Sequence, residues 1–240
     1  MASYPAPALV TWGIAGISAV VAVLSFLLVR RAAHAAAPDR AGRLTLSAGA
    51  IIVAWVAFVG LLSGSGLLAR FDLRPPPIGL LLPVILAAGL TVGLSARTTF
   101  LVNGLPLAAL VGLQAFRLPL ELVMHEAANA GVMPVQLSFS GYNFDIVTGA
   151  GAAVLAPLIA MGKAPRWAIT LWNLYGFLAL AAIAVIAILT APFVRFFGDG
   201  SVNAWVAYLP FTYLPALLVV VALIGHCLVA RWLRAHPTEL

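Results

Sequence analysis

The chain has 240 residues, of which 63% are hydrophobic and 8% are charged, and its mean hydropathy is +1.10. Soluble domains carry about 25% charged residues, so this chain cannot cover a water-facing surface. Apolar runs that can cross about 30 Å of hydrocarbon as helices recur along it. The runs are continuous, which excludes the alternating strands of an outer-membrane barrel. The sequence therefore predicts an all-α, polytopic transmembrane helix bundle that forms a single transmembrane domain.

The net charge of +6 would suggest a nucleic-acid partner in a soluble protein. Here the basic residues lie mainly in short connections, where they set topology and meet anionic lipid headgroups. We therefore expect the lipid bilayer and its headgroups as partners, and no nucleic acid. Cys227 is the only cysteine, which excludes an intrachain disulfide and CxxC motifs.

We predict seven spans. The first apolar run is expected to be retained, because no basic residue precedes it and no A-x-A cleavage site follows it. The spans cover about residues 8–29, 44–69, 78–95, 100–128, 145–161, 167–194 and 204–232.

The distribution of basic residues predicts the topology, because cytoplasmic loops are enriched in Lys and Arg. With the N-terminus outside, nine of the 13 basic residues lie in cytoplasmic connections: Arg30, Arg31, Arg40, Arg43, Arg97, Lys163, Arg166, Arg231 and Arg234. Three lie outside, and Arg117 is left within the membrane. The chain is thus predicted to run N-out and C-in, in a bacterial inner membrane.

The fourth span is unusual because it carries ionisable residues in an apolar run. At about 100° per residue, Gln114, Arg117, Glu121 and His125 fall within about 80° of one helix face, and Asn103 lies on the same line. A charge that faces lipid costs several kcal/mol, so this stripe should face the bundle interior or a watery cavity. With the predicted topology, the stripe runs from mid-membrane to the outer surface, and Pro106 and Pro119 should break the helix locally.

The stripe residues have alternative roles. The i,i+4 spacing of Arg117 and Glu121 is that of a pair that neutralises itself. A second interpretation, compatible with the first, has Arg117 bind an anionic ligand group and Glu121 act as a titrating group. His125 is a metal ligand, a proton-sharing partner or an interfacial histidine. Glu-x3-His supplies two ligands where a catalytic zinc site uses three, so a metal site is not the leading expectation. Glu126 is offset on the helix and should face solvent.

The turn before the fifth span adds two further polar candidates. Asp145 is placed to cap that helix through the amides of Val147 or Thr148. Alternatively, the turn folds over the mouth of the stripe, and Asn143 and Asp145 close the site.

No cofactor is expected. A retinal protein needs a lysine within a span, and Lys163, the only lysine, lies in a predicted cytoplasmic turn. His226 lies near the inner end of the last span, too far in depth from His125 for a shared haem. Asn173 is a lone polar residue in the sixth span, where a helix–helix hydrogen bond is expected.

The segment FRLPLELVMH, followed by PVQLSFSGYNFDIVTG, resembles a pattern of uncharacterised bacterial multi-pass membrane proteins. That pattern reads roughly F-R-x3-E-L-x2-H/W and then P-x-Q-[ML]-[TS]-F-x-G-x-N-F-D-I. The matching positions here are Phe116, Arg117, Glu121, Leu122, His125, Pro134, Gln136, Phe139, Gly141, Asn143, Phe144, Asp145 and Ile146. The resemblance implies that these residues belong together, and it implies no activity.

Three functional hypotheses follow. In the first, an outward-opening intramembrane site formed by Gln114, Arg117, Glu121, His125, Asn143 and Asp145 binds or transports a small polar or anionic ligand, or protons. In the second, a membrane-embedded enzyme uses Glu121 and His125 as acid and base or as metal ligands. In the third, the chain is a structural subunit of a larger complex or a homo-oligomer, and Arg117–Glu121 is a buried ion pair.

Overall fold

A computed structural model describes residues 4–237. Its α-helices are α1 (Ala8–Ala36), α2 (Ala41–Gly64), α3 (Pro77–Leu94), α4 (Thr99–Gly104), α5 (Leu107–Leu113), α6 (Arg117–Asn129), α7 (Ile146–Ala160), α8 (Arg166–Leu189) and α9 (Val220–Ala235). A 3-10 turn (Gln114–Phe116) joins α5 to α6, and a π-helical segment (Leu214–Val219) leads into α9.

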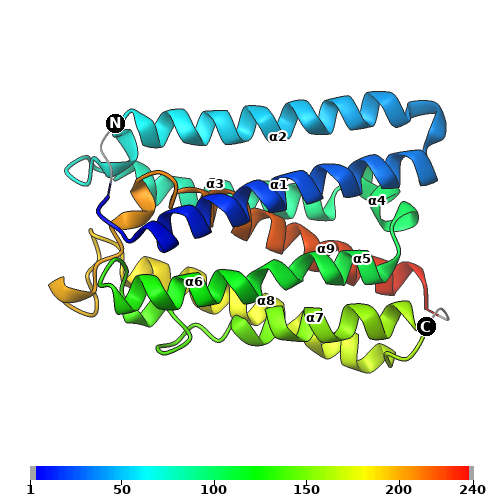
Figure 1. The fold of residues 1–240 in the computed structure, drawn as a ribbon. Coiled ribbons are helices and arrows are strands. Elements are labelled where there is room, and N and C mark those ends of the chain that lie inside the picture. The colour runs from blue at the N-terminus through cyan, green and yellow to red at the C-terminus, as the bar shows by residue number, and fades with distance from the viewer. Residues whose placement is uncertain (1–3, 238–240) are drawn as a thin grey trace.

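The helices form an elongated bundle, with α1 beginning at one end and α9 finishing at the other (Figure 1). We call these the first end and the second end. No strand occurs within residues 4–237. Six helical stretches are long and apolar enough to cross a membrane. The prediction of a multi-pass, all-α membrane protein is therefore confirmed, whereas α7, with 15 residues, is too short to count as a seventh span by itself.

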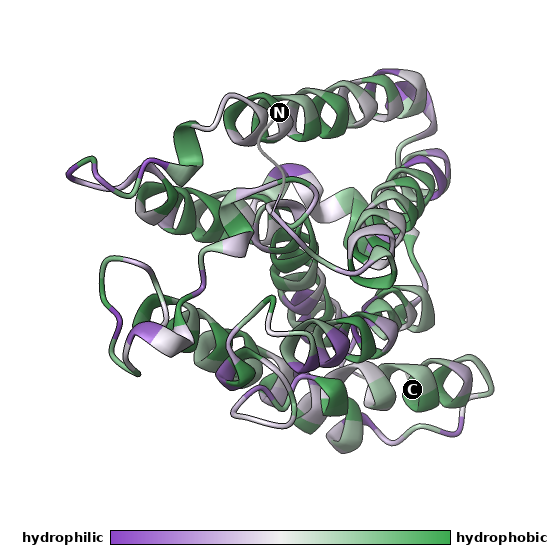
Figure 2. Ribbon diagram, turned by 60° about the vertical axis from the view of Figure 1, so that its left-hand side comes forward, coloured by the Kyte–Doolittle hydropathy of each residue, from purple (hydrophilic) through white to green (hydrophobic). Residues whose placement is uncertain are grey.

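Large apolar side chains face outward along the bundle. Trp12, Leu46 and Leu61 are each more than 70% exposed, at 73%, 76% and 74%. Figure 2 shows helices that are mostly green along their length, with purple concentrated in loops and at helix ends. This is the reverse of a soluble fold, and it matches helices whose outer surface contacts lipid.

Helix α9 is the central helix of the bundle. Of the most apolar 18 residues in α9 and the π-helical segment before it, 67% are buried, whereas only 6% are buried in the corresponding 18 residues of the stretch that contains α2. Small residues let α3 pack closely against it, because a Cβ on Gly89 or Gly93 would lie 2.8 Å from Leu223 or 2.6 Å from Cys227. Small residues at four-residue spacing let helix backbones approach closely in this way.

The predicted fourth span is interrupted. Leu105 is extended (ψ 136°) before Pro106, so α4 ends there and α5 starts again at Leu107. The break predicted at Pro106 is thus confirmed, and it takes Asn103 off the polar stripe, leaving that residue exposed. Pro119 makes no separate break, because it lies in the first turn of α6, where its missing N–H is not needed.

Helix α7 lies beside α5, α6 and α8 and reaches the second end, where α8 begins (Figure 1). At about 1.5 Å per residue it is only about 22 Å long. The preceding segment 138–145 is not helical and runs along α6 from the first end, since Ser140 lies beside His125, Asn143 beside Glu121 and Asp145 beside Arg117. This segment and α7 together bring Asn143 and Asp145 into the bundle.

Candidate functional site

Arg117, the first residue of α6, is 1% exposed and forms an ion pair with Asp145, from Nε to Oδ2, at 3.0 Å. Among residues 4–237 there are two other ion pairs, both in loops and both more than half exposed: Arg70–Asp72 and Arg195–Asp199. The buried partner of Arg117 is therefore Asp145 and not Glu121, so the i,i+4 pair that the sequence offered as one alternative is not formed. The amides of α7 receive no capping hydrogen bond from the Asp145 side chain, because that carboxylate faces the guanidinium.

Glu121 is 1% exposed and has a neutral partner. The Asn143 side-chain amide donates to Glu121 Oε1 at 2.9 Å and to the carbonyl of Leu137 at 3.0 Å. The Asn143 side-chain oxygen accepts the backbone amide of Asp145 at 3.1 Å. Asn143 thus holds the two carboxyl groups in one cluster, while Glu121 Oε2 has no hydrogen-bond partner.

His226 of α9 extends the cluster toward α8. Arg117 Nη1 lies 2.9 Å from His226 Nε2, and His226 Nδ1 lies 2.8 Å from the Asn173 side-chain oxygen. Because a guanidinium can only donate, Nε2 accepts, and the neutral ring carries its proton on Nδ1, which donates to Asn173. The ring packs between Trp172 and Phe177. His226 is therefore locked in one tautomer between Arg117 and Asn173.

Three glycines allow close packing at the site, one against the α6 backbone and two against polar side chains. A Cβ on Gly149 of α7 would overlap the backbone at Arg117, and one on Gly176 of α8 would overlap the His226 ring. A Cβ on Gly225 of α9 would overlap the side-chain amide of Gln114, which is fully buried and has no hydrogen-bond partner. Each glycine lies on a different neighbouring helix, so the bundle is shaped around these side chains.

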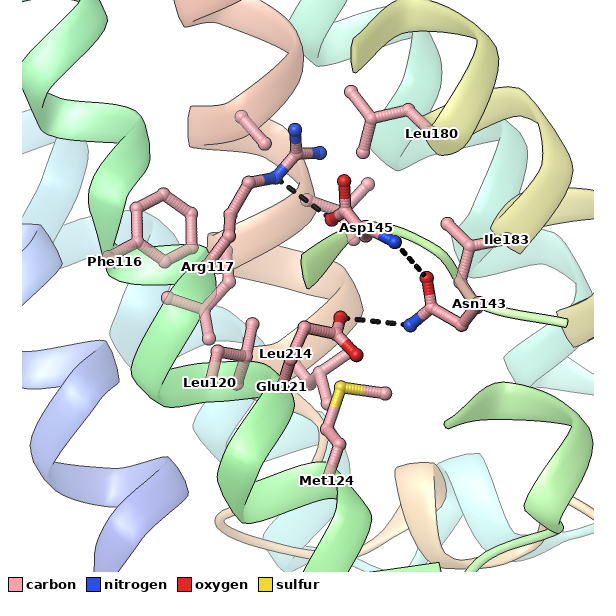
Figure 3. A pocket seen from close by; sticks show the side chains of 13 residues that line it. Phe116, Arg117, Leu120, Glu121, Met124, Asn143, Asp145, Leu180, Ile183 and Leu214 are labelled. Carbon is pink, nitrogen blue, oxygen red and sulfur yellow. Dashed lines mark hydrogen bonds and ion pairs between the residues drawn. The ribbon is translucent and has the colours of Figure 1, made fainter. Parts of the chain in front are cut away.

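A small cavity of about 30 Å³ lies beside the cluster (Figure 3). That volume holds one or two water molecules, whereas sites for small organic ligands are about 300–1,000 Å³. Nine of its lining residues are apolar and four are polar: Phe116, Leu120, Met124, Leu180, Ile183, Leu214, Leu218, Val219 and Ala222, with Arg117, Glu121, Asn143 and Asp145. The cavity is thus apolar except on the side formed by the charged cluster.

His125 lies apart from this cluster. It is half-buried one turn beyond Glu121, where its Nδ1 is 3.2 Å from Ser140 Oγ and 3.4 Å from Ser138 Oγ, and it stacks on Phe139. Within residues 4–237, no group of three or more His, Cys, Asp and Glu side chains is placed to hold a metal ion. The structure therefore brings together four of the six residues expected at the site, Arg117, Glu121, Asn143 and Asp145. Gln114 is buried beside Gly225 with no hydrogen bond to these residues, and His125 lies toward the first end. The ligand-binding role expected for these residues stays a prediction.

The interior between the cluster and the second end is apolar. Among the described residues, the buried side chains packed beyond Gln114 in this direction include Leu105, Leu107, Leu110, Val111, Leu228, Val229, Trp232 and Leu233. Toward the first end, by contrast, Ser138, Ser140 and His125 continue the polar series. Apolar residues also pack on the first-end side, among them Leu120, Met124 and Leu137, so the two sides differ only in the additional polar groups toward the first end.

His226 and Asn173 were not expected at this site. The sequence suggested a helix–helix hydrogen bond for Asn173, and the bond to His226 confirms it. The predicted depths of His226 and His125 in the membrane differ, and depth by itself gave no indication that His226 lies close to Arg117. A histidine and an asparagine within otherwise apolar spans are the signal that pointed to them, because such groups rarely face lipid.

No protein-family model, no curated protein and no solved structure matches the chain. Any function inferred for the candidate site therefore rests on the geometry of the site alone.

Proposed function

We propose that this chain is a proton-binding membrane protein whose buried cluster holds an exchangeable proton on Glu121. The observation that supports this is the pairing pattern. Arg117 gives its charge to Asp145, so an ionised Glu121 would have only the amide of Asn143 as a partner. With both carboxylates ionised, the cluster would carry a net charge of −1 in an apolar interior, which costs several kcal/mol.

A proton on Glu121 removes that charge. Because Oε1 accepts the Asn143 amide, the proton belongs on Oε2, the oxygen without a protein partner. A cavity that admits one or two water molecules lets this proton exchange, whereas it is too small for an organic ligand in this conformation. The same pairing weighs against an anion on Arg117, and the position of His125 weighs against an enzyme that uses Glu121 and His125 together.

The proton would exchange with the first end of the bundle. This direction is supported by the polar groups of His125, Ser138 and Ser140, which lie on that side. The resemblance to bacterial multi-pass proteins covers the residues of this cluster, and we propose that it marks a shared proton site.

We further propose seven crossings of a bacterial inner membrane, N-out and C-in, with segment 138–145 and α7 forming the fifth crossing together. The excess of Lys and Arg in the connections at the second end supports this orientation, and there those side chains would meet anionic headgroups. In this orientation the proton exchanges with the outer side.

Infrared spectroscopy of the protein in lipid nanodiscs at neutral pH tests the proton on Glu121. Exposed carboxyl groups are ionised there, so the C=O band of a protonated carboxyl group should come from the buried cluster. We expect this band in the parent, a shift of the band in D2O, and its loss in Glu121→Gln. The matched control is Glu126→Gln, because Glu126 is exposed on the same helix, five residues beyond Glu121, and the substitution should leave the band unchanged.

Two outcomes contradict the proposal. One is a parent spectrum without the band. The other is a band that survives in Glu121→Gln and disappears in Asp145→Asn, which would put the proton on Asp145.

A further inference from the structure

The charge of the cluster also restricts what can replace the proton on Glu121. Arg117 and Asp145 neutralise each other, and His226 is neutral because it accepts from Arg117. When the proton leaves, one negative charge stays on Glu121. A partner that leaves no uncompensated buried charge must therefore carry a single positive charge. Anions and neutral ligands do not satisfy this condition.

The wall of the cavity separates metal ions from organic cations. Hard metal ions bind through several oxygen ligands, about six or more for Ca²⁺. Among the lining residues, the carboxylate oxygens without a partner are Glu121 Oε2 and Asp145 Oδ1, and the oxygen of Asn143 already accepts an amide. The rest of the wall is apolar and includes the aromatic ring of Phe116 and the thioether of Met124. Such a wall suits the apolar body of an organic cation, and an aromatic ring attracts its charge.

From these features we propose that an amphipathic, monovalent organic cation binds beside Glu121 in exchange for its proton. The proposal rests on the proton site proposed above and adds the class of ligand. One carboxyl group would hold either a proton or the cation, so that each leaves when the other binds.

Room for the cation would come from a wall that is not regular α-helix. Leu214, Leu218 and Val219 line the cavity and belong to the π-helical segment, a rare conformation that occurs frequently at functional sites. This segment is held from outside by Trp55, whose indole N–H donates to the carbonyl of Ala216 at 2.6 Å. A change from π-helix to α-helix would move these side chains relative to α6.

The second movable wall is segment 138–145, which carries Asn143 and Asp145. A shift of this segment would break no helical hydrogen bonds, but it would have to keep the ion pair of Asp145 with Arg117 and release the hydrogen bond of Asn143 to Glu121. The cavity can thus widen on two sides while the apolar packing toward the second end stays closed. Binding would then be controlled from the first end only.

The test uses the full chain in nanodiscs of zwitterionic lipid, with benzyltrimethylammonium as the cation and benzenesulfonate as an anion of similar shape. Calorimetry measures binding, and a pH-indicator dye in weakly buffered solution measures proton release. We expect saturable binding of the cation with release of about one proton per protein, and neither effect with the anion. Binding should be at least about a hundredfold weaker in Glu121→Gln, partly restored in Glu121→Asp and unchanged in Glu126→Gln.

The outcomes separate the two proposals. If the infrared band of Glu121 is present but the cation neither binds nor releases a proton, the ligand class is wrong and the proton site stands. Binding of benzenesulfonate in place of the cation, or cation binding without proton release, would also overturn the exchange. If the band is absent, the proton site itself fails. Proton release from the parent needs no variant, so the test does not depend on the folding of Glu121→Gln.

Discussion

Neutralising Asp145 should destabilise the protein far more than neutralising an exposed aspartate in the same kind of ion pair. Arg117 and Asp145 are 3.0 Å apart and at most 9% exposed. At an effective dielectric constant of about 20, two unit charges at this distance attract by about 5–6 kcal/mol. Asp145→Asn leaves Arg117 charged, buried and without its carboxylate. We therefore expect the free energy of unfolding to fall by about 3–5 kcal/mol.

Reversible unfolding in mixed micelles with increasing SDS, followed by tryptophan fluorescence, measures this loss. The control is Asp72→Asn, which removes an ion pair of 2.7 Å whose aspartate side chain is 62% exposed, and it should change nothing measurable. The double variant Arg117→Gln/Asp145→Asn should lose less than the sum of the two single variants, by at least about 2 kcal/mol. Equal stability of the two aspartate variants, or strict additivity in the double variant, would refute the assignment of a buried, coupled pair.

Two further predictions concern packing and topology. Gly176→Ala would push a methyl group into the His226 ring and should lower the free energy of unfolding by about 1–3 kcal/mol in the same assay. The control is Gly16→Ala, whose methyl group meets no atom within 4 Å and should be neutral or slightly stabilising. Equal effects of the two substitutions would argue against close packing of α8 on the histidine ring. Lys163, the only lysine, is exposed at the second end, so a membrane-impermeant amine reagent should modify it in inverted vesicles and leave it unmodified on intact cells, and the opposite result would reverse the proposed orientation.

Composition and the length of the apolar runs predicted the class of fold well, because both reflect the solvent that surrounds the helices and not the way the helices pack. Helical phase predicted correctly that Gln114, Arg117 and Glu121 are buried, since the 3-10 turn over Gln114–Phe116 interrupts the helix without an extended residue. Helical phase failed for Asn103, because the break at Pro106 lies between Asn103 and Gln114 and changes the direction in which Asn103 points. Phase carries information only as far as the helix is continuous.

The choice of partners within the site was not predictable in the same way. The i,i+4 spacing along α6 suggested Glu121 as the partner of Arg117. In the structure, Arg117 pairs with Asp145, and Glu121 accepts a hydrogen bond from Asn143. His226, which contacts Arg117 from α9, lies 109 residues further along the chain. Such contacts depend on how helices pack in three dimensions, and the hydropathy of one chain does not contain that information.

The short helix α7 has a consequence for how the chain enters the bilayer. At about 22 Å it is too short to cross about 30 Å of hydrocarbon alone. The stretch that contains α5 and α6 has the lowest hydropathy of the six long ones, 1.5 against 2.1 to 2.3, because it includes Arg117 and Glu121. Both neighbours are therefore weak insertion signals. In the seven-crossing arrangement proposed above, the ion pair between Arg117 and Asp145 joins these two segments, so they would gain most by entering the bilayer together, as a hairpin whose charges are already matched.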